Sequence, residues 1–453
     1  VISFKKNIFS IKFIEFEMKL YKKSLKTMKK KRSIFIYIIY FLLTLITIST
    51  LGINKNYFSI KENIYRKYPN LKTEFRKNLF KKKSVIENLK NDYNYKFLPE
   101  TQFLKLNFKK KKIFFNDYYY SYRTKNPNKY YHNTFFIDKY KDDLIFTDYL
   151  GGIYKTKIKN LKNDSLKVIT PNGIKSNLTS VRVLDSLVHK ENLYVSYVLE
   201  DNDCKKLNIS VARINTNFLK FDNLFNSKEC PKFIQGGRMV SYKHNNIDGL
   251  LFTTSSVKLD EYDDKPQNDN SIYGKILFID LLTKDYIIFS KGHRNIQGLY
   301  ATKDLILATE HGPRGGDEIN KILFNKNYGW PIASYGEKYS ISNSKKSSYT
   351  QNHYSQGFEE PLFAFIPSIG ISEIIHLPNT FSKIFNNNFI ISSLYGHNIF
   401  RIKFDRDYTR VIFNEKIFIG DRIRDIKFND QINGIILALE KNGEIGIITK
   451  SEK

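Results

Sequence analysis

From about residue 132 onward, short apolar runs recur along the chain, separated by Asn, Asp, Gly and Lys. Most runs are short, and several alternate apolar and polar residues with a period of two, which is typical of half-buried β-strands. The pattern shows no long amphipathic helix in this region. We expect strands at Asp143–Thr147, Leu193–Val198, Gly249–Thr253, Lys275–Asp280, Leu305–Thr309, Asn388–Ser392 and Gly434–Leu439.

Many short strands joined by turn residues predict an all-β domain, which is a sandwich, a barrel or a propeller. A second pattern is an apolar strand, a turn and then a strand that ends in Tyr, Phe or Ile beside Lys or Arg. It recurs at Gly152–Lys155, Asn398–Arg401 and Gly443–Gly446. Dividing about 320 residues by six gives roughly 53 per unit, within the range of propeller blades. The pattern alone therefore predicts an all-β domain at 132–453 that is compatible with a propeller.

Residues 34–53 carry no charge and are long enough to cross a bilayer as a helix. They follow the basic run Lys29–Arg32, and no small-x-small cleavage site is clear, so we expect an uncleaved transmembrane signal anchor. A buried helix of a soluble domain is the alternative, which the lack of a polar stripe disfavours. Residues 1–33 would then be a basic cytoplasmic segment and 54–131 a stem or linker. Met28 raises the hypothesis that translation starts there and excludes 1–27.

Composition indicates a large folded core, because 41% of residues are hydrophobic and 15% aromatic. The formal net charge is +29. It suggests either an anionic partner or a compositional drift towards Lys and other residues that AT-rich codons encode. We favour the drift, because lysines are spread along the chain. Local runs such as Lys109–Lys112 form no known nucleic-acid motif, so no nucleic-acid partner is expected.

The chain has two cysteines, Cys204 and Cys230, whose spacing is not that of a metal site. Outside the cytoplasm they could form a disulfide closing a loop of about 25 residues, worth about 3 kcal/mol in the chain-entropy model. Two unpaired thiols are the alternative, and the sequence favours neither.

The segment His311–Asn320, HGPRGGDEIN, follows a predicted strand. Its glycines allow unusual backbone conformations and Pro313 removes a backbone donor, which leaves carbonyl oxygens free to bind something. Asp317 and Glu318 place two carboxylates near this bend. Carbonyl and carboxylate oxygens are the ligands of a hard cation such as Ca²⁺. The alternative is a Gly-rich loop capped by Asp317.

Together with three further segments, this motif resembles the glucose/sorbosone dehydrogenase family. The segments are Gly292–Leu299 (GHRNIQGL), Asn325–Pro331 (NKNYGWP) and Asp421–Asp425 (DRIRD), in the order and spacing of that family. The resemblance covers the chain from about residue 230 to its end and is faint before it. It implies a six-bladed β-propeller whose enzymes hold pyrroloquinoline quinone (PQQ) and Ca²⁺ at the wide mouth and oxidise sugars.

The resemblance also implies roles for individual residues. The carbonyls of Gly312 and Pro313 would bind the calcium that holds the cofactor, and Glu318 and the Tyr328 backbone would match a second calcium site, with Asp317 beside them. Arg294, Asn295 and Gln297 would face the quinone ring as catalytic residues. The cofactor-binding set would be Arg294, Asn295, Arg422 and Arg424.

The chemistry of PQQ agrees with the cofactor-binding role implied for Arg422 and Arg424. PQQ is a planar tricarboxylate, and arginine pairs with carboxylates through two parallel hydrogen bonds. Arg422 and Arg424 alternate along one strand, so they share a face. The alternative is a pair of surface charges.

The sequence departs from the family at the position of the catalytic base. The family places a His just before a Gly-Arg pair, and this chain has Ile234, which cannot accept a proton. Tyr395 replaces a Lys that contacts the cofactor in the family. Where the family has a Pro-Ser-Gly segment, this chain has Gly-Ile-Ser-Glu at Gly370–Glu373. His293, His311 and Glu373 are candidate substitute bases, each more commonly structural.

Three hypotheses follow. The first is a PQQ- and calcium-dependent aldose dehydrogenase, anchored to a membrane with its propeller on the periplasmic side. The second is a membrane-tethered propeller that binds a saccharide or protein without turnover. The third is basic adhesion to anionic polymers through Lys109–Lys112. We expect the first, because more pocket positions match the family than depart from it.

Overall fold

The computed structural model describes residues 105–113, 115, 133–178, 181–201, 204–214, 218–258, 263–338 and 349–451. These residues belong to one compact unit, Lys96–Lys453. Residues 34–53, predicted as a transmembrane anchor, lie outside the described residues, as do residues 1–33 and most of the predicted stem. Within the described ranges, no helix is both long and apolar enough to cross a membrane.

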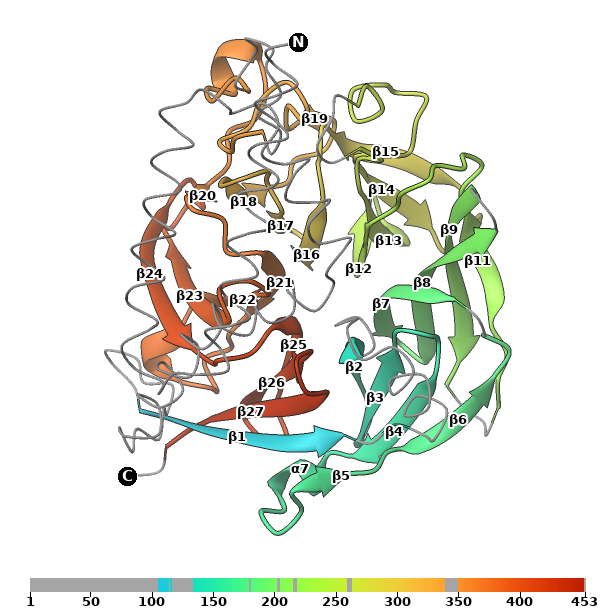
Figure 1. The fold of residues 1–453 in the computed structure, drawn as a ribbon, viewed down its shortest axis with the longest axis vertical. Helices are drawn as coiled ribbons and strands as arrows, with labels where there is room; N and C mark the ends of the chain where they lie inside the picture. Colours follow the sequence, from blue (N-terminus) through green and yellow to red (C-terminus); the bar gives the residue numbers. More distant parts are fainter. Residues whose placement is uncertain are drawn as a thin grey trace, which may run out of the picture. The chain divides into compact units, whose positions relative to one another are not determined.

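The described residues form six β-sheets of four or five strands, arranged as blades around a central axis (Figure 1). Each sheet begins with an innermost strand, and each innermost strand contacts the innermost strands of the two neighbouring blades. The chain is therefore the all-β six-bladed propeller that the sequence predicted.

Each blade is listed from its innermost strand outward. Blade 1 is β2 (Phe135–Tyr140), β3 (Asp143–Asp148), β4 (Ile153–Lys157), β6 (Asn172–Ser176) and β10 (Phe218–Leu219); blade 2 is β7 (Arg182–His189), β8 (Asn192–Asp201), β9 (Cys204–Arg213) and β11 (Asp222–Asn226); blade 3 is β12 (Gly236–His244), β13 (Ile247–Thr254), β14 (Lys275–Asp280), β15 (Tyr286–Lys291) and β19 (Lys326–Asn327).

Blades 4 to 6 complete the ring, and short helices occur between some of the described strands. Blade 4 is β16 (Ile296–Ala301), β17 (Ile306–Glu310), β18 (Asp317–Lys321) and β20 (Phe363–Phe365); blade 5 is β21 (Ile371–His376), β22 (Asn388–Ser393), β23 (Asn398–Phe404) and β24 (Val411–Phe418); blade 6 is β25 (Ile423–Asn429), β26 (Gly434–Leu439), β27 (Glu444–Lys450), β1 (Leu106–Ile113) and β5 (Val168–Ile169); the helices are α7 (Lys159–Lys162), η2 (Tyr354–Gln356) and η3 (Lys383–Phe385).

Strand β1 closes the ring. It precedes all other strands in the sequence, yet it pairs antiparallel with β27, the last strand of the chain, from Leu106↔Lys450 to Lys112↔Glu444. Strand β1 lies within the stretch 54–131 that the sequence assigned to a stem. Because it supplies a strand of blade 6, the first and last parts of the propeller are joined by backbone hydrogen bonds, which leaves β27 no open edge.

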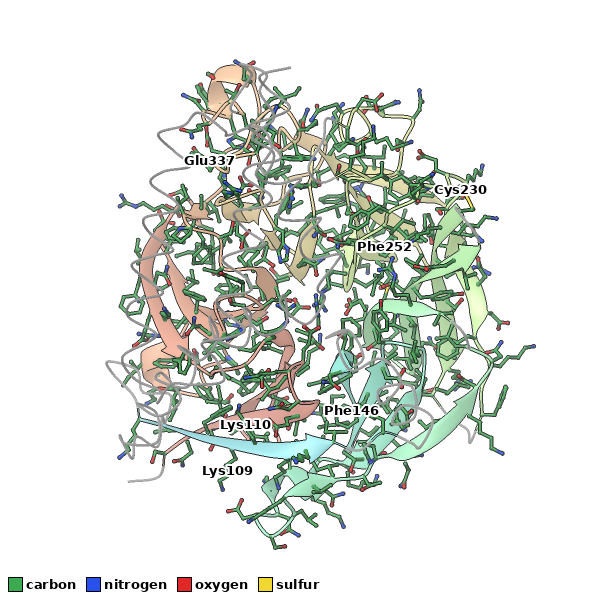
Figure 2. The ribbon with its side chains drawn as sticks, in the orientation of Figure 1. Lys109, Lys110, Phe146, Cys230, Phe252 and Glu337 are labelled. Atoms are coloured by element: carbon green, nitrogen blue, oxygen red, sulfur yellow. A yellow bond between two sulfur atoms is a disulfide. The ribbon has the colours of Figure 1, made fainter. Side chains whose placement is uncertain are left out.

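The hydrophobic core is divided among the six contacts between neighbouring blades. Each of six clusters of buried residues draws its side chains from two adjacent sheets. Phe146 and Phe252, for example, are fully buried in two different clusters (Figure 2). The second strand of a blade has apolar neighbours on both faces, which explains why β22 and β26 are buried along their whole length.

The axis of the ring holds a buried ionic cluster, formed by side chains of the innermost strands. The Nη1 of Arg238 lies 3.0 Å from Asp185, 3.2 Å from Glu373 and 3.8 Å from Asp425, and all four side chains are buried. The carboxylates also accept backbone N–H groups of the next blade: Asp185 from Met239, and Asp425 from Ile137. We call Arg238, Asp185, Glu373 and Asp425 the axial cluster.

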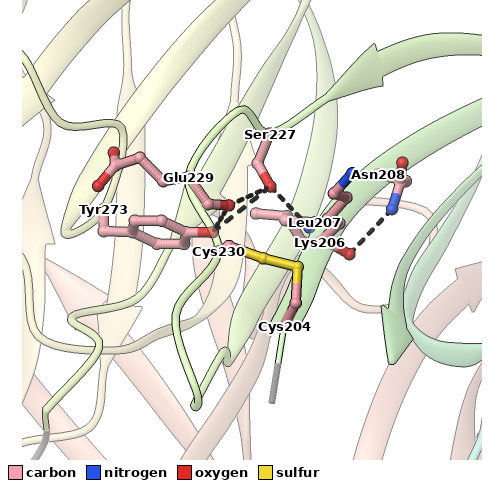
Figure 3. Close-up of a disulfide and its surroundings, with 8 residues drawn as sticks. All are labelled: Cys204, Lys206, Leu207, Asn208, Ser227, Glu229, Cys230 and Tyr273. Carbon is pink, nitrogen blue, oxygen red and sulfur yellow. Dashed lines mark hydrogen bonds between the residues drawn. A yellow bond between two sulfur atoms is a disulfide. The ribbon is translucent and has the colours of Figure 1, made fainter. Parts of the chain in front are cut away.

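The two cysteines form a disulfide, the first of the two states that the sequence left open (Figure 3). Cys204 begins β9, and Cys230 lies in the connection that leads to β12. Ser227 supports this connection, because its Oγ accepts the N–H of Leu207 and donates to the carbonyl of Glu229. The bond therefore joins blade 2 to the segment that enters blade 3.

Two lysines of the run in β1 have acidic partners, and a third is buried. Lys109 pairs with Asp164 at 2.7 Å, and Lys110 lies 3.8 Å from Asp421. Lys111 is buried, and its Nζ donates to the carbonyls of Asn160 and Asn163 at the end of α7. Lys109 and Lys110 project from β1 (Figure 2), but their acidic partners weaken the case for this run as an adhesion site.

Candidate functional site

The motif segments identified in the sequence meet at one end of the ring. The N–H of His311 donates to the carbonyl of Asn295, and the hydroxyl of Ser372 donates to the carbonyl of Arg424. The first contact lies within blade 4, and the second joins blade 5 to blade 6. A hydrogen bond from His311 Nε2 to the carbonyl of Ile371 joins blade 4 to blade 5, so the three blades meet where their innermost strands begin. We call this end of the axis the mouth.

Irregular pairing shapes the mouth. In β16, β21 and β25 the register shifts near the start of the strand, and the shifts fall at Gln297, at Ser372–Glu373 and at Arg424. In β12 the shift falls at Gly237–Arg238. A β-bulge bends its strand and re-aims side chains. Gln297 and Arg424, which match the family, and Ser372–Glu373, which belongs to the altered segment, are therefore positions where the sheet is locally distorted.

A continuous chain of polar side chains crosses the mouth from blade 3 to blade 6. Asn295 Nδ2 donates to Gln235 at 2.7 Å, and Gln297 Nε2 donates to Asn295 at 2.8 Å. Arg424 Nη1 donates to Gln297 at 3.2 Å, and its Nε donates to Glu440 at 2.6 Å. We call these side chains, with Arg422, the mouth chain.

Glu440 holds both arginines of the mouth chain. Its Oε2 accepts Arg422 Nε at 3.2 Å, while Thr134 donates to its Oε1 at 2.7 Å. Burial opposes ionisation of this carboxyl, yet Arg424 and Arg422 hold its pKa below the usual value. Glu440 is therefore an ionised carboxylate, and two guanidinium groups share its single charge.

Arg294 lies beside the mouth chain and contacts the glycine-rich loop. Its Nη1 donates to the carbonyls of His311 at 2.9 Å and Gly312 at 2.7 Å, and its guanidinium lies 5.3 Å from the centre of the Trp330 ring. The backbone N–H of Arg294 donates to Glu310. The predicted cofactor contact is thus held in place by the loop that was predicted to bind calcium.

Asp317 organises that loop. Its Oδ1 accepts the N–H of Gly312, and its Oδ2 accepts the N–H groups of Ile369 and Ile371. Three backbone donors from two loops converge on this side chain, which is the capping role considered for it. Gly312 has no room for a side chain, because an added Cβ would lie 1.9 Å from the carbonyl oxygen of Gly316.

Glu318 points into a different, buried environment. Asn320 Nδ2 lies 3.3 Å from Glu318 and 3.4 Å from Glu310. Burial, with Glu310 close by, raises the pKa of Glu318 well above its usual value. Tyr328 is linked to this region through His293, whose ring stacks on it and also contacts Glu310. No group of three or more His, Cys, Asp or Glu side chains arranged for a metal occurs in the described ranges.

The three positions that depart from the family differ in their surroundings. Ile234 is buried in the cluster between blades 2 and 3, so the polar contact at this strand entry comes from its neighbour Gln235. Tyr395 is exposed at the turn between β22 and β23. Glu373 of the altered Gly370–Glu373 segment belongs to the axial cluster, where it contacts Arg238.

The candidate substitute bases are not equivalent. His293 is fully buried between Ser290 and Glu310, so both ring nitrogens have partners. The Nε2 of His311 donates to the carbonyl of Ile371, while its Nδ1 makes no hydrogen bond with a described residue. Burial lowers the pKa of His311, which favours the neutral ring. Of these candidates, His311 alone combines partial exposure with an unengaged ring nitrogen.

Sequence reasoning missed Glu440 and Gln235. Glu440 directly follows β26, a strand of six buried apolar residues, and a charged residue at the end of such a strand was the available signal. Gln235 directly follows Ile234, and nothing in the sequence around it marks it as a partner of Asn295. Both residues were missed because their importance depends on partners far away in the sequence.

Comparison with known proteins gives a family and several relatives. The family model described as Glucose / Sorbosone dehydrogenase matches residues 143–449. The aldose sugar dehydrogenase YliI of Escherichia coli is 30% identical over 162 residues, which are 35% of this chain and 42% of that protein. Quinoprotein glucose dehydrogenase B of Acinetobacter calcoaceticus is 50% identical over 50 residues, which are 11% of this chain and 10% of that protein. The aligned parts thus span less than half of these curated relatives.

Solved structures show the same fold. The soluble aldose sugar dehydrogenase of Escherichia coli, in its apo form, superposes with a TM-score of 0.56 at 19% sequence identity. The superposition covers 70% of this chain and 95% of that one.

Proposed function

The chain belongs to the glucose/sorbosone dehydrogenase family, and from this we propose that it is a PQQ- and calcium-dependent aldose dehydrogenase that acts outside the cytoplasm. The observation that carries the proposal is the mouth chain, in which Gln235, Asn295, Gln297, Arg424, Glu440 and Arg422 are joined by hydrogen bonds across three blades. The names of two relatives, an aldose sugar dehydrogenase and a quinoprotein, support the same chemistry.

The mouth chain fits a flat, anionic cofactor. Its two arginines converge on one carboxylate, Glu440, and Arg294 places a third guanidinium group beside the chain. Guanidinium groups pair with carboxylates and stack on planar rings. Arg422, Arg424 and Arg294 would hold the cofactor. When bound, PQQ supplies a quinone that accepts two electrons from the sugar.

The amides of the mouth chain would orient the reacting partners. Asn295 is fixed by Gln235 and Gln297, and Gln297 is fixed by Arg424. Side chains held in one orientation before a ligand arrives need no reorganisation when charge develops on it. The departure at Ile234 removes the family's proton acceptor, and this is the feature that favours the alternative of a binding protein without turnover.

Two places are proposed for calcium. The carbonyls of Gly312 and Pro313 already accept hydrogen bonds from Arg294 and Ser368, and each retains a second lone pair. The surroundings of Glu318 fit a cation more directly. This buried carboxyl has a raised pKa, and Asn320 Oδ1 beside it is buried with no hydrogen-bond partner among the described residues. A bound cation would satisfy both groups.

The disulfide supports the extracytoplasmic part of the proposal. Stable disulfides form in oxidising compartments and are rare in the cytoplasm. Cys204 and Cys230 are the chain's only two cysteines, and they are bonded to each other. The anchor predicted at 34–53 would place the propeller on that side of the membrane.

The decisive experiment titrates the purified chain with PQQ, with and without Ca²⁺. Trp330 is the chain's single tryptophan and lies beside Arg294, so its fluorescence reports on the mouth. We expect quenching by PQQ, followed by dye reduction when an aldose is added. Quenching without dye reduction for any aldose would replace the dehydrogenase with a ligand-binding protein, and no quenching at all would remove the cofactor.

Calcium is tested separately by thermal unfolding. Saturation at about 100 times the dissociation constant stabilises a protein by about 2.7 kcal/mol, which corresponds to a rise of several degrees in the unfolding midpoint. We expect such a rise with Ca²⁺ and its loss in Glu318→Gln. Glu337→Gln, a change in another loop carboxylate, is the control and keeps the rise. An equal rise in both variants would exclude Glu318 as a ligand.

A further inference from the structure

Lys275, the first residue of β14, is fully buried and belongs neither to the mouth chain nor to the axial cluster. Its Nζ donates to three backbone carbonyls, those of Lys265 at 2.6 Å, Pro266 at 3.0 Å and Tyr273 at 3.0 Å. An ammonium group has three donors, so these bonds satisfy it completely. Burying a charge is costly unless it is hydrogen-bonded in this way, so a lysine at this position calls for an explanation.

The three acceptors belong to one loop, residues 263–274, which leads into β14 and which we call the Lys275 loop. Lys265 and Pro266 lie near its start and Tyr273 near its end, so one cation joins the two ends. Burial lowers the pKa of Lys275 to about 8, which leaves the ammonium form dominant at pH 7. The side chain thus supplies the positive charge that a bound metal ion supplies to carbonyl oxygens in other proteins.

The same loop holds the backbone that leads to Arg294. The carbonyl of Pro266 accepts the N–H of Gly292 at 3.0 Å, and the carbonyl of Gly274 accepts the N–H of His293 at 3.1 Å. Gly274 has φ +69°, and a Cβ added there would lie 2.6 Å from Pro266 and 2.7 Å from the carbonyl oxygen of His293. The two residues before Arg294 are therefore packed directly against the loop.

Gln267, in the middle of the loop, holds the aromatic partner of Arg294. Its Nε2 donates to the carbonyl of Trp330 at 2.7 Å, and its Oε1 accepts Asn327 Nδ2 at 2.7 Å. The N–H of Trp330 donates to the carbonyl of Gly292 at 2.9 Å. The Trp330 ring lies 5.3 Å from the Arg294 guanidinium, so both members of this pair are supported by one loop.

From this arrangement we propose that the Lys275 ammonium is a built-in cation that fixes the Arg294–Trp330 pair, which makes Lys275 a positioning residue of the proposed cofactor site. The inference rests on the proposed function, in which Arg294 holds the cofactor. All three bonds of the ammonium end within the loop. Removing the charge should therefore loosen this wall of the mouth more than the ring itself, and a binding group that is held loosely loses affinity.

The first test is Lys275→Met, which keeps an unbranched apolar side chain and removes the cation. Two of the three carbonyls keep a second donor, the N–H groups of Asn268 and Gly292, so the blade should remain folded. Trp330 is only 3% exposed, and we expect its emission without any ligand to shift to longer wavelength and to be quenched more by acrylamide. The dissociation constant for PQQ should rise about tenfold.

Lys111→Met is the matched control. Lys111 is also buried, and its ammonium also donates to backbone carbonyls, but it lies in β1 towards the outer edge of blade 6. Its loss should lower stability while Trp330 emission and the affinity for PQQ stay as in wild type. Equal changes in the two variants would overturn the proposal, because the emission would then report a general loss of stability.

The role of the charge is tested by chemical rescue in Lys275→Ala, with Trp330 emission recorded in the absence of PQQ. Propylammonium replaces the atoms that this substitution removes, and 1-propanol has nearly the same size without the charge. We expect propylammonium to restore the wild-type emission and 1-propanol to leave it shifted. Restoration by both compounds, or by neither, overturns the built-in cation.

Gln267→Leu cuts the support at its other end and leaves Lys275 in place. It should shift Trp330 emission in the same direction, and it decides the question if Lys275→Met does not fold, since an unchanged emission would overturn the proposal. A shifted emission with wild-type affinity for PQQ in both variants overturns the positioning role. If wild type binds no PQQ, the proposed function falls, and the emission recorded without cofactor still shows whether Lys275 fixes the pair.

Discussion

The axial cluster and the mouth chain both pair arginine with carboxylate, but in opposite proportions. On the axis, Arg238 is surrounded by Asp185, Glu373 and Asp425, and its side chain is only 2% exposed. At the mouth, Arg422 and Arg424 share Glu440 and are 27% and 15% exposed. One site has an excess of carboxylates away from water, and the other has an excess of guanidinium groups within reach of it.

The difference separates a structural site from a binding site. Burial without enough positive charge raises the pKa of carboxyls, and it raises that of Asp185 to about 7. The axial groups satisfy one another and the backbone of neighbouring blades, so they hold the ring together. The mouth chain gathers two guanidinium groups on one carboxylate, an arrangement that suits an anionic ligand.

The largest expected effect is a loss of stability on substituting Arg238, the arginine of the axial cluster. Arg238→Met leaves three buried carboxyls without their shared guanidinium, although Lys427 remains 3.6 Å from Asp425. Removing one partner of a buried ionic group costs about 3–5 kcal/mol. We expect a loss of that size in the free energy of unfolding, measured by denaturant titration.

Arg410→Ala is the matched control for this change. Arg410 lies near Asp405 at 3.7 Å but is 77% exposed, and exposed ion pairs contribute little to stability. We expect a change of less than about 0.5 kcal/mol. Similar losses in Arg238→Met and Arg410→Ala would show that the axial cluster does not stabilise the ring.

At the mouth, the same kind of change should alter binding more than folding. Arg424→Met removes donors to Glu440 and Gln297, and a hydrogen bond to a charged group is worth about 1.5–3 kcal/mol. We expect the dissociation constant for PQQ to rise about thirtyfold, measured by quenching of Trp330 fluorescence. The free energy of unfolding should fall by less than in Arg238→Met. If stability falls as far as in Arg238→Met while binding is kept, the mouth chain is structural.

The apolar runs that the sequence predicted as strands are those with apolar neighbours on both faces. Apart from Lys275–Asp280, the short apolar runs expected as strands are the second strands of the blades, such as Asn388–Ser392 in β22 and Gly434–Leu439 in β26. These strands lie between two apolar layers, so their residues form continuous apolar runs. The innermost strands carry charged residues and bulges, as β25 does with its Arg424 and Asp425, and their periodicity is broken.

Strand β1, which lies within the predicted stem, lacks the continuous apolar run of the second strands. Its sequence, LNFKKKKI, contains four consecutive lysines, a composition that predicts exposure. In the fold, Lys111 can be buried because carbonyls at the end of α7 accept hydrogen bonds from its ammonium group. A partner located about 50 residues away cannot be recognised from the run itself, and the same limit hid Glu440 from the candidate site.

The smallest expected effect is on the pH dependence of the free energy of unfolding, and it arises from a buried carboxyl on an innermost strand. Asp138 of β2 contacts Ser186 at 2.5 Å and Val188 N at 3.2 Å, and Lys427 and Asp425 are the nearest charged groups. Burial raises the pKa of Asp138 to about 7, whereas an aspartate in an unfolded chain titrates near 4. Between these values the folded chain keeps a proton that the unfolded chain has released. Raising the pH through this window therefore lowers the free energy of unfolding.

Asp138→Asn cannot titrate, and its amide keeps an oxygen for the N–H of Val188. We expect the loss of stability between pH 5 and pH 7.5 to shrink by about 1 kcal/mol, less than the shift alone would give because neighbouring groups adjust. Asp430→Asn, at an exposed carboxylate, is the control and keeps the wild-type slope. Denaturant titrations at the two pH values measure the difference. A steeper slope in Asp138→Asn would mean that this carboxyl is ionised in the fold and stabilised by Lys427, so that the axis would carry balanced charge and the contrast with the mouth would disappear.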